Sequence, residues 1–128
     1  MDDESLMAAA LEEAHRAREA GEVPIGAVVA VDGEIVAIRE AARRVGSYRL
    51  TGASLCVTIE PCLMCVGALV HARIATLVFG AAEPKSGAVV TTVRGGDLPG
   101  LNHRFEVVSG VREADCRELM QAFFRQRR

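Results

Sequence analysis

The sequence predicts an α/β domain in which a mixed sheet of five strands is flanked by helices. Three observations predict it. Apolar runs of strand length alternate along the chain with segments of helical periodicity. One of these runs, residues 35–38, is apolar on both faces, as expected where helices cover both sides of a sheet. The 128 residues, of which 50% are apolar, suit one hydrophobic core, so we assign residues 1–128 to a single domain.

The first element is a helix over residues 4–20. Its apolar residues recur at the i, i+3, i+4, i+7 spacing of one helical face, and they are Met7, Ala10, Leu11 and Ala14. His15 falls on the polar side of this pattern, so we expect it at the surface. Gly21 is a natural stop for the helix.

A β-hairpin is expected next. Residues 25–31 form an apolar run, Asp32-Gly33 is a strong hairpin turn signal, and residues 34–38 supply the returning strand. The pattern then changes period. Residues 39–44 contain helix formers and are followed by a glycine stop, which indicates a short helix.

The second half of the chain continues the alternation. We expect strands over residues 54–59, 75–80 and 104–109, and helices over residues 62–73 and 112–127. The last helix is amphipathic, and Cys116 lies on its apolar side. We therefore expect Cys116, like Cys56 in its strand, to be a core residue. Residues 83–104 contain four glycines and two prolines, and long segments of this kind are usually functional or disordered.

Composition excludes several classes of protein. No apolar run approaches the length of a membrane span, and the acidic N-terminus reads as a helix and not as a signal peptide. Four cysteines in a chain of this length do not suggest a disulfide scaffold, so we expect a cytoplasmic protein without membrane contact. The net charge of −2 argues against coating nucleic acid by bulk charge, although a basic patch is compatible with it.

Two cysteines, Cys62 and Cys65, lie where an apolar strand passes into an apolar helix. The helix dipole and the free N–H groups at a helix start favour thiolates, and two neighbouring thiolates suit zinc. Pro61 fits just before or at the first helical turn because it lacks an N–H. Two other interpretations stay open: a pair of small apolar residues at a buried turn, and a redox dithiol.

Several runs together carry a family resemblance. The sequences VPIGAVV, SYRLTGASLCVTIEPCLMCVGALVHARI, LVFGAAEPKSGA and LNHRFEVVSGV, with a closing FFRQRR, resemble bacterial tRNA-specific adenosine deaminases in order and over nearly the whole chain. The resemblance implies the three-layer α/β/α fold of the cytidine deaminase superfamily. It also implies a homodimer that converts the wobble adenosine of tRNA to inosine with one zinc ion per chain.

In that family one His and two Cys hold the zinc, and a Glu from a His-Ala-Glu motif moves the proton. The resemblance makes Cys62 and Cys65 zinc ligands, and it places Glu60 and Pro61 in the turn that shapes the site. The His ligand does not carry over. The three histidines of the chain are His15, His71 and His103, and all of them lie outside the zinc motif.

Measured against the family's pattern, this sequence lacks the His-Ala-Glu segment, and the resemblance implies a chain shortened near residues 33–39. The stretch EIVA, residues 34–37, fits both sides of the gap, so Glu34 stands either for the residue after the hairpin turn or for the catalytic Glu. In the family's topology, the first strand ends at the opposite edge of the sheet from the point where the following helix starts. If residues 34–45 were all helix, the one or two residues between that strand and the helix would have to span a strand length of ~17–20 Å. That path does not close. We therefore favour the hairpin, with Glu34 beside the turn.

Three functions follow as hypotheses. The first is a zinc-dependent deaminase of tRNA adenosine, with the base and the third ligand unassigned. The second is a catalytically impaired protein of the same fold that still binds RNA. The third is a Cys-x-x-Cys thiol oxidoreductase. For the first two, we expect a local basic patch to border the substrate groove, formed by Lys85, Arg125, Arg127 and Arg128.

Overall fold

The computed structural model describes residues 2–36 and 51–126. Its helices are α1 (Asp3–Glu19), α3 (Leu63–Ala72) and α4 (Glu113–Gln126), with a short 3-10 turn at Gly95–Asp97. Its strands are β1 (Ala27–Val31), β2 (Glu34–Val36), β3 (Ser54–Ile59), β4 (Thr76–Ala81) and β5 (Glu106–Val108). The helix expected at residues 39–44 lies outside the described residues.

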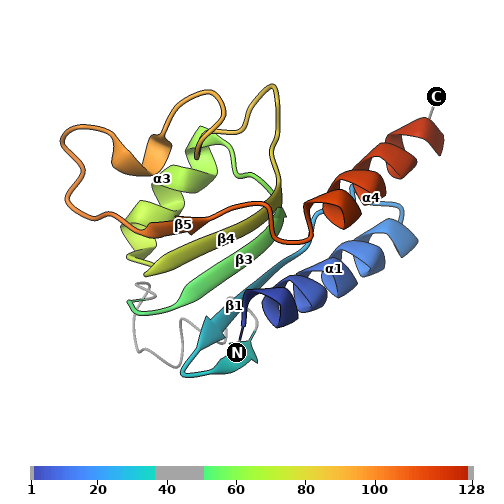
Figure 1. The fold of residues 1–128 in the computed structure, drawn as a ribbon, viewed down its shortest axis with the longest axis horizontal. Coiled ribbons are helices and arrows are strands. Elements are labelled where there is room, and N and C mark those ends of the chain that lie inside the picture. The colour runs from blue at the N-terminus through green and yellow to red at the C-terminus, as the bar shows by residue number, and fades with distance from the viewer. Residues whose placement is uncertain (1, 37–50, 127–128) are drawn as a thin grey trace.

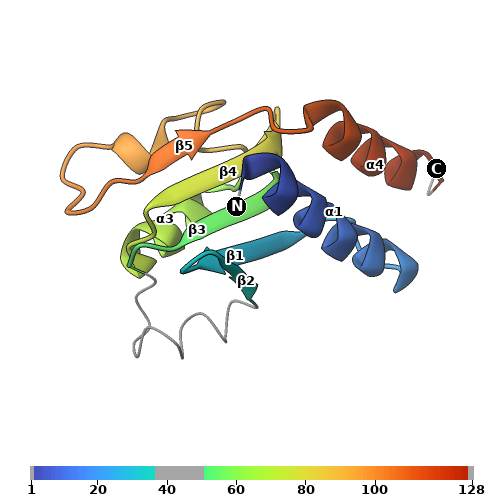
Figure 2. The same cartoon turned by 60° about the horizontal axis from the view of Figure 1, so that its bottom comes forward.

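The five strands form one mixed sheet in the order β2-β1-β3-β4-β5 (Figure 2). Strand β1 is antiparallel to both β2 and β3, whereas β3, β4 and β5 run parallel to one another. The hairpin is confirmed, because Val31 pairs with Glu34 around the turn. Asp32 and Gly33 have φ of 52° and 79°, and a two-residue turn with both φ values positive matches the right-handed twist of the strands.

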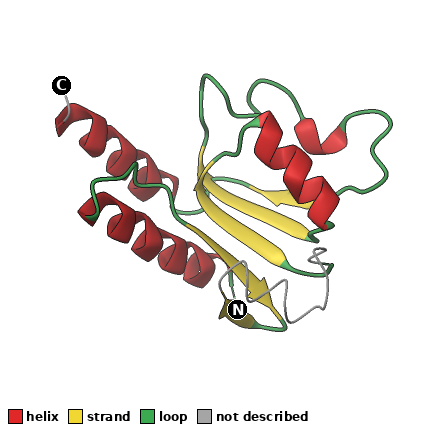
Figure 3. Ribbon diagram, turned by 180° about the vertical axis from the view of Figure 1, so that it is seen from behind, coloured by secondary structure: helices red, strands yellow, loops and turns green. Residues whose placement is uncertain are grey.

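Helices cover both faces of this sheet, which gives three layers (Figures 1 and 3). Helix α3 packs on one face against a cluster that includes Leu55, Leu77 and Phe79. Helices α1 and α4 pack on the other face around Cys56 and Val78. Neighbouring strand residues point to opposite faces, so residues 55 and 56, and likewise residues 77 and 78, belong to different cores. The expected three-layer fold is confirmed.

The layer of α1 and α4 is built on a buried sulfur cluster. The thiols of Cys56 and Cys116 lie 3.9 and 3.7 Å from the sulfur of Met7, and each cysteine is at most 1% exposed. Burial raises the pKa of Cys56 to about 12 and that of Cys116 to about 11, so both stay protonated thiols. These two cysteines are core residues, as expected from the sequence, and they differ in this respect from the pair at the start of α3.

No helix in residues 2–36 and 51–126 combines the length and the apolar composition needed to cross a membrane. Helix α1 begins at Asp2, whose carboxylate accepts a hydrogen bond of 2.8 Å from the backbone N–H of Ser5. His15 is exposed, as its place in the helical pattern predicted.

The chain directly before strand β1 approaches helix α1 so closely that residue 26 must be glycine. A Cβ at Gly26 would lie 1.9 Å from the backbone oxygen of Ala10, whereas a Cβ at Gly67 in α3 would meet nothing within 4 Å. We expect Gly26→Ala to lower the free energy of unfolding by about 1–3 kcal/mol. Gly67→Ala, the matched control, is expected to raise it by about 0.5–1 kcal/mol because glycine is a poor helix former.

Urea denaturation of the two variants beside the parent protein measures both effects. Equal midpoints for Gly26→Ala and the parent would show that α1 can move away from β1 without cost, and would contradict the close approach.

Candidate functional site

The cysteine pair lies at the start of helix α3, just beyond the end of strand β3 (Figure 1). Cys62 is the N-cap residue with extended backbone (φ −79°, ψ 173°), and its carbonyl accepts the first helical hydrogen bond from Val66 at 2.9 Å. Cys65 follows within the first turn, which brings the two Sγ atoms to 3.7 Å from each other. Cys62 is half-buried and Cys65 is exposed, so solvent and small molecules reach both sulfurs.

The environment separates the acidities of the two thiols. The backbone N–H of Cys65, together with its thiol, lowers the pKa of Cys62 below its ordinary value. Burial, with the neighbouring sulfur of Cys62, raises the pKa of Cys65. Cys62 is therefore favoured as the thiolate and Cys65 as the protonated thiol.

An apolar cavity of about 470 Å³ opens beside the cysteine pair. Cys62 and Cys65 form part of its wall with Pro61 and Glu60, and most of the remaining wall is hydrocarbon from β1, β3, α3 and α4: Ile25, Ala27, Leu55, Val57, Leu69 and Met120. A cavity of a few hundred Å³ with an apolar wall and a few polar groups is typical of sites for small ligands.

Glu60 connects this site to the segment over residues 83–91. Its side chain is 3% exposed, and its carboxylate accepts hydrogen bonds from the backbone N–H groups of Glu83 (3.2 Å), Val89 (2.9 Å), Val90 (2.8 Å) and Thr91 (3.0 Å). The Thr91 hydroxyl donates a further bond. Burial raises the pKa of the Glu60 carboxyl, but the bonds from Thr91, Val90 and Val89 outweigh burial and hold that pKa below its ordinary value.

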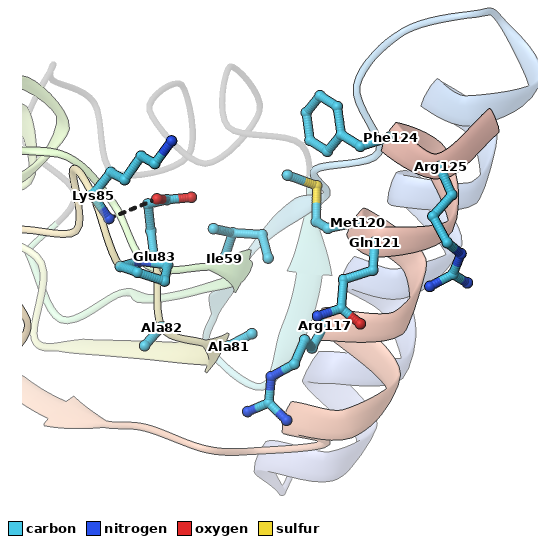
Figure 4. A pocket seen from close by; sticks show the side chains of 11 residues that line it. Ile59, Ala81, Ala82, Glu83, Lys85, Arg117, Met120, Gln121, Phe124 and Arg125 are labelled. Carbon is cyan, nitrogen blue, oxygen red and sulfur yellow. Dashed lines mark hydrogen bonds between the residues drawn. The ribbon is translucent and has the colours of Figure 1, made fainter. Parts of the chain in front are cut away.

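A second, larger cavity of about 640 Å³ adjoins the first, since Ile59, Glu83 and Met120 line both. Figure 4 shows its side chains, with Lys85 on one side and Met120 and Phe124 on the other. Its wall includes three cations, Lys85, Arg117 and Arg125. Arg117 and Arg125 form ion pairs within α4, whereas Lys85 forms none with any residue that the structure describes. Arg127 and Arg128 lie outside the described residues.

The structure does not bring Glu34 to the cysteine pair. Glu34 pairs with Val31, and the preceding residue of β1, Ala30, pairs with Ser54 at the start of β3. The cysteines follow the other end of β3, about 17 Å away at a rise of ~3.3 Å per residue. Glu34 is thus a turn-flanking strand residue, and its position gives no support to a role as the base.

None of the three histidines stands at the cysteine pair. His15 is exposed on α1, in the opposite helix layer. His71 lies near the end of α3, about 9 Å along the helix from Cys65 at ~1.5 Å per residue. The ring of His103 contacts the carbonyl oxygen of Ile74 at 2.7 Å, before the start of β4. Over residues 2–36 and 51–126, no three His, Cys, Asp or Glu residues are grouped to hold a metal. The described residues therefore do not fit a one-His, two-Cys zinc site.

Sequence reasoning missed two parts of this site. The family resemblance places Glu60 only in the turn, although an acidic residue directly after an apolar strand that is buried from Leu55 to Ile59 signals a carboxylate with many hydrogen-bond partners. Arg117 and Phe124 were not assigned to the basic cavity, because which side of α4 faces the 83–91 segment follows from the packing.

Comparison with known proteins gives consistent matches. The family model of the MafB19-like deaminases matches residues 30–128. The tRNA-specific adenosine deaminase of Bacillus subtilis (strain 168) is 43% identical, over 98% of this chain and 91% of its own length. The protein of the same name from Haemophilus influenzae is 39% identical, over 98% of this chain and 85% of its own length. A solved structure from a study of A-to-I editing by tRNA:A34 deaminases has a TM-score of 0.84 at 39% identity, over 90% of this chain and 98% of that one.

The match to the Bacillus relative also shows a difference in length. Their alignment runs over 146 positions, more than the 128 residues of this chain, so part of the relative's aligned span has no counterpart here. Identity of 39% or more over nearly the whole chain nevertheless establishes common descent with these relatives. This chain belongs to the tRNA-specific adenosine deaminases, a family of hydrolytic deaminases.

Proposed function

We propose that the protein acts on tRNA and that its reaction is the hydrolytic deamination of the wobble adenosine to inosine. The observation that carries this proposal is the arrangement of the two cavities. An apolar cavity with room for a base has Cys62 and Cys65 in its wall, and a cavity with three cations adjoins it. A base taken out of the stack requires the first kind of surface, and the phosphates around it require the second.

The cations are proposed to hold the RNA backbone. Lys85 and Arg125 lie on opposite sides of the larger cavity, and Phe124 adds an aromatic surface on which a base can stack (Figure 4). Arg127 and Arg128 extend the charge of the same chain end in the sequence. The carboxylate of Glu60 supports Lys85 indirectly, because its hydrogen bonds fix the segment on both sides of this lysine.

Zinc is proposed to bind Cys62 and Cys65, by family resemblance, with a third ligand that the described residues do not supply. A chelating metal site loses affinity steeply with each ligand removed. We therefore propose that this chain alone deaminates tRNA much more slowly than an intact member of its family. The alignment of 146 positions against 128 residues supports a chain that has lost an internal segment.

We propose that the protein works in the cytoplasm as a homodimer, as its resemblance implies. All four cysteines are free thiols, which suits a reducing compartment. Leu63 and Met64, beside the cysteine pair, are 54% and 82% exposed, and such apolar side chains favour association with another protein surface.

Binding of tRNA tests the proposed substrate. We expect the double variant Lys85→Ala/Arg125→Ala to bind tRNA more weakly than the parent, and its plot of log affinity against log salt to flatten by about 1–2. Each phosphate contact that forms on binding releases about one counterion from the RNA, so each contact that the variant lacks makes the slope shallower by about one. Fluorescence anisotropy over a salt series measures both quantities.

The matched control is Arg94→Ala/Arg104→Ala, which removes two cations from a segment that lines neither cavity. Its salt slope should equal that of the parent. Equal slopes for all three proteins would remove Lys85 and Arg125 from the RNA surface.

A further inference from the structure

The four cysteines of the chain form two pairs with opposite properties. Cys56 and Cys116 are at most 1% exposed and lie in the core beside Met7. Cys62 and Cys65 have accessible sulfurs 3.7 Å apart, a distance of van der Waals contact. We propose that Cys62 and Cys65 form a reversible intramolecular disulfide, which makes this cavity wall a redox-controlled modification site. The disulfide lies outside the deaminase function proposed above and does not depend on it.

The local backbone favours closure of this bond. Cys62 is the N-cap residue and Cys65 lies in the first turn of α3, so both side chains project from the same end of one helix. The sulfurs lie 3.7 Å apart, and a covalent bond requires them to approach to ~2.05 Å. The described residues offer no third ligand that would hold a metal between the two sulfurs, so nothing in this part of the chain keeps them apart.

Oxidation by a small-molecule disulfide such as glutathione disulfide completes the electron balance. One cysteine thiolate attacks a sulfur of glutathione disulfide, whose S–S bond breaks and releases one glutathione thiolate. The second cysteine thiolate then attacks the mixed disulfide and releases the second glutathione. The two cysteines lose two electrons together, glutathione disulfide gains them, and the two protons of the thiols pass to the departing glutathione thiolates.

A disulfide between Cys62 and Cys65 removes both thiolates that could bind a metal. Metal binding and the disulfide are therefore mutually exclusive states of the same two atoms. Their balance follows the ratio of glutathione to its disulfide in the surrounding solution.

The test uses the purified protein, free of metal, equilibrated in buffers of graded glutathione to glutathione disulfide ratio. After an acid quench, N-ethylmaleimide is added under denaturing conditions and the intact mass is measured. We expect the number of alkylated cysteines to fall from four to two as the disulfide form of glutathione increases. Peptide mapping should find Cys62 and Cys65 joined to each other, and dithiothreitol should restore four alkylation sites.

Two single variants and one buried control sharpen the result. Cys62→Ser and Cys65→Ser should each leave one reactive thiol that takes up glutathione without an internal bond. Cys56→Ala should form the disulfide between Cys62 and Cys65 at the same ratio of glutathione to glutathione disulfide as the parent. The proposal is overturned if the parent keeps four alkylatable cysteines in excess glutathione disulfide, if Cys62 and Cys65 each carry glutathione, or if Cys56 or Cys116 joins the bond. Mapping of the parent alone decides this, whether or not a variant folds.

Discussion

A zinc-replete preparation of this protein is expected to hold well below one zinc ion per chain and to form little inosine in tRNA. Cys62 and Cys65 supply two ligands, while His15, His71 and His103 all lie away from them. A missing ligand weakens a chelate, and a missing general base by itself costs about 10²–10⁴ in rate. Metal analysis after gel filtration and a single-turnover assay of inosine on tRNA measure the two expected results together.

The Bacillus subtilis relative, 43% identical, is the positive control when it is prepared and assayed in the same way. The double variant Cys62→Ala/Cys65→Ala is the negative control, and the small zinc content of the parent should fall to its level of background. One tightly held zinc per chain with turnover equal to that of the relative would refute this prediction. Such a result would require ligands and a base from outside residues 2–36 and 51–126, or from a second chain.

Glu60→Gln is expected to lower the free energy of unfolding by about 3 kcal/mol, a large part of the total stability of a small domain. The buried carboxylate accepts bonds from four backbone N–H groups and one hydroxyl. An amide of the same shape replaces one acceptor oxygen by an NH₂ group that faces these donors, so two or three of these buried and part-buried donors lose their partner. Urea denaturation followed by circular dichroism measures the loss.

The matched control is Glu22→Gln, at an exposed position after α1, where a change within about 0.5 kcal/mol is expected. Acidification gives a second check. The pKa of Glu60 is lower in the folded protein than its ordinary value, so its contribution is present above the unfolded pKa and is lost as pH falls through the folded pKa. The difference between parent and Glu60→Gln should therefore shrink in acid. A difference that is small at neutral pH, or constant with pH, would contradict the role of the carboxylate.

Much of the fold was predictable because it depends on local patterns. The apolar stripe of α1, the Asp32-Gly33 turn and the run over β3 each specify an element by a local pattern, and the structure has these elements within about two residues of the expected bounds. Residues 37–38 of the expected returning strand lie outside the described residues. The parallel pairing of β3 with β4 follows from the helix between them, because a crossover connection brings the chain back in the same direction.

The site was less predictable because its parts come together only through packing. The segment over residues 83–104 reads as irregular in sequence, yet the Glu60 carboxylate orders its first half through contacts 23 to 31 residues apart in the chain. No local pattern encodes such contacts. The distance of Glu34 from Cys62 depended likewise on the register of three strands, which the sequence left ambiguous because the single EIVA stretch, residues 34–37, fits both sides of the gap relative to the family.

Within the described residues, the two strands at the edges of the sheet are both short. Strand β2 and strand β5 each span three residues, and each begins with a glutamate. A short edge strand exposes few unpaired backbone groups, and a charged side chain there opposes pairing with another molecule. Strand β2 is the returning strand of the Asp32-Gly33 hairpin, so it pairs with β1 and leaves only its own outer side open. Within the described residues, neither edge therefore presents the long unpaired strand that promotes amyloid-like aggregation.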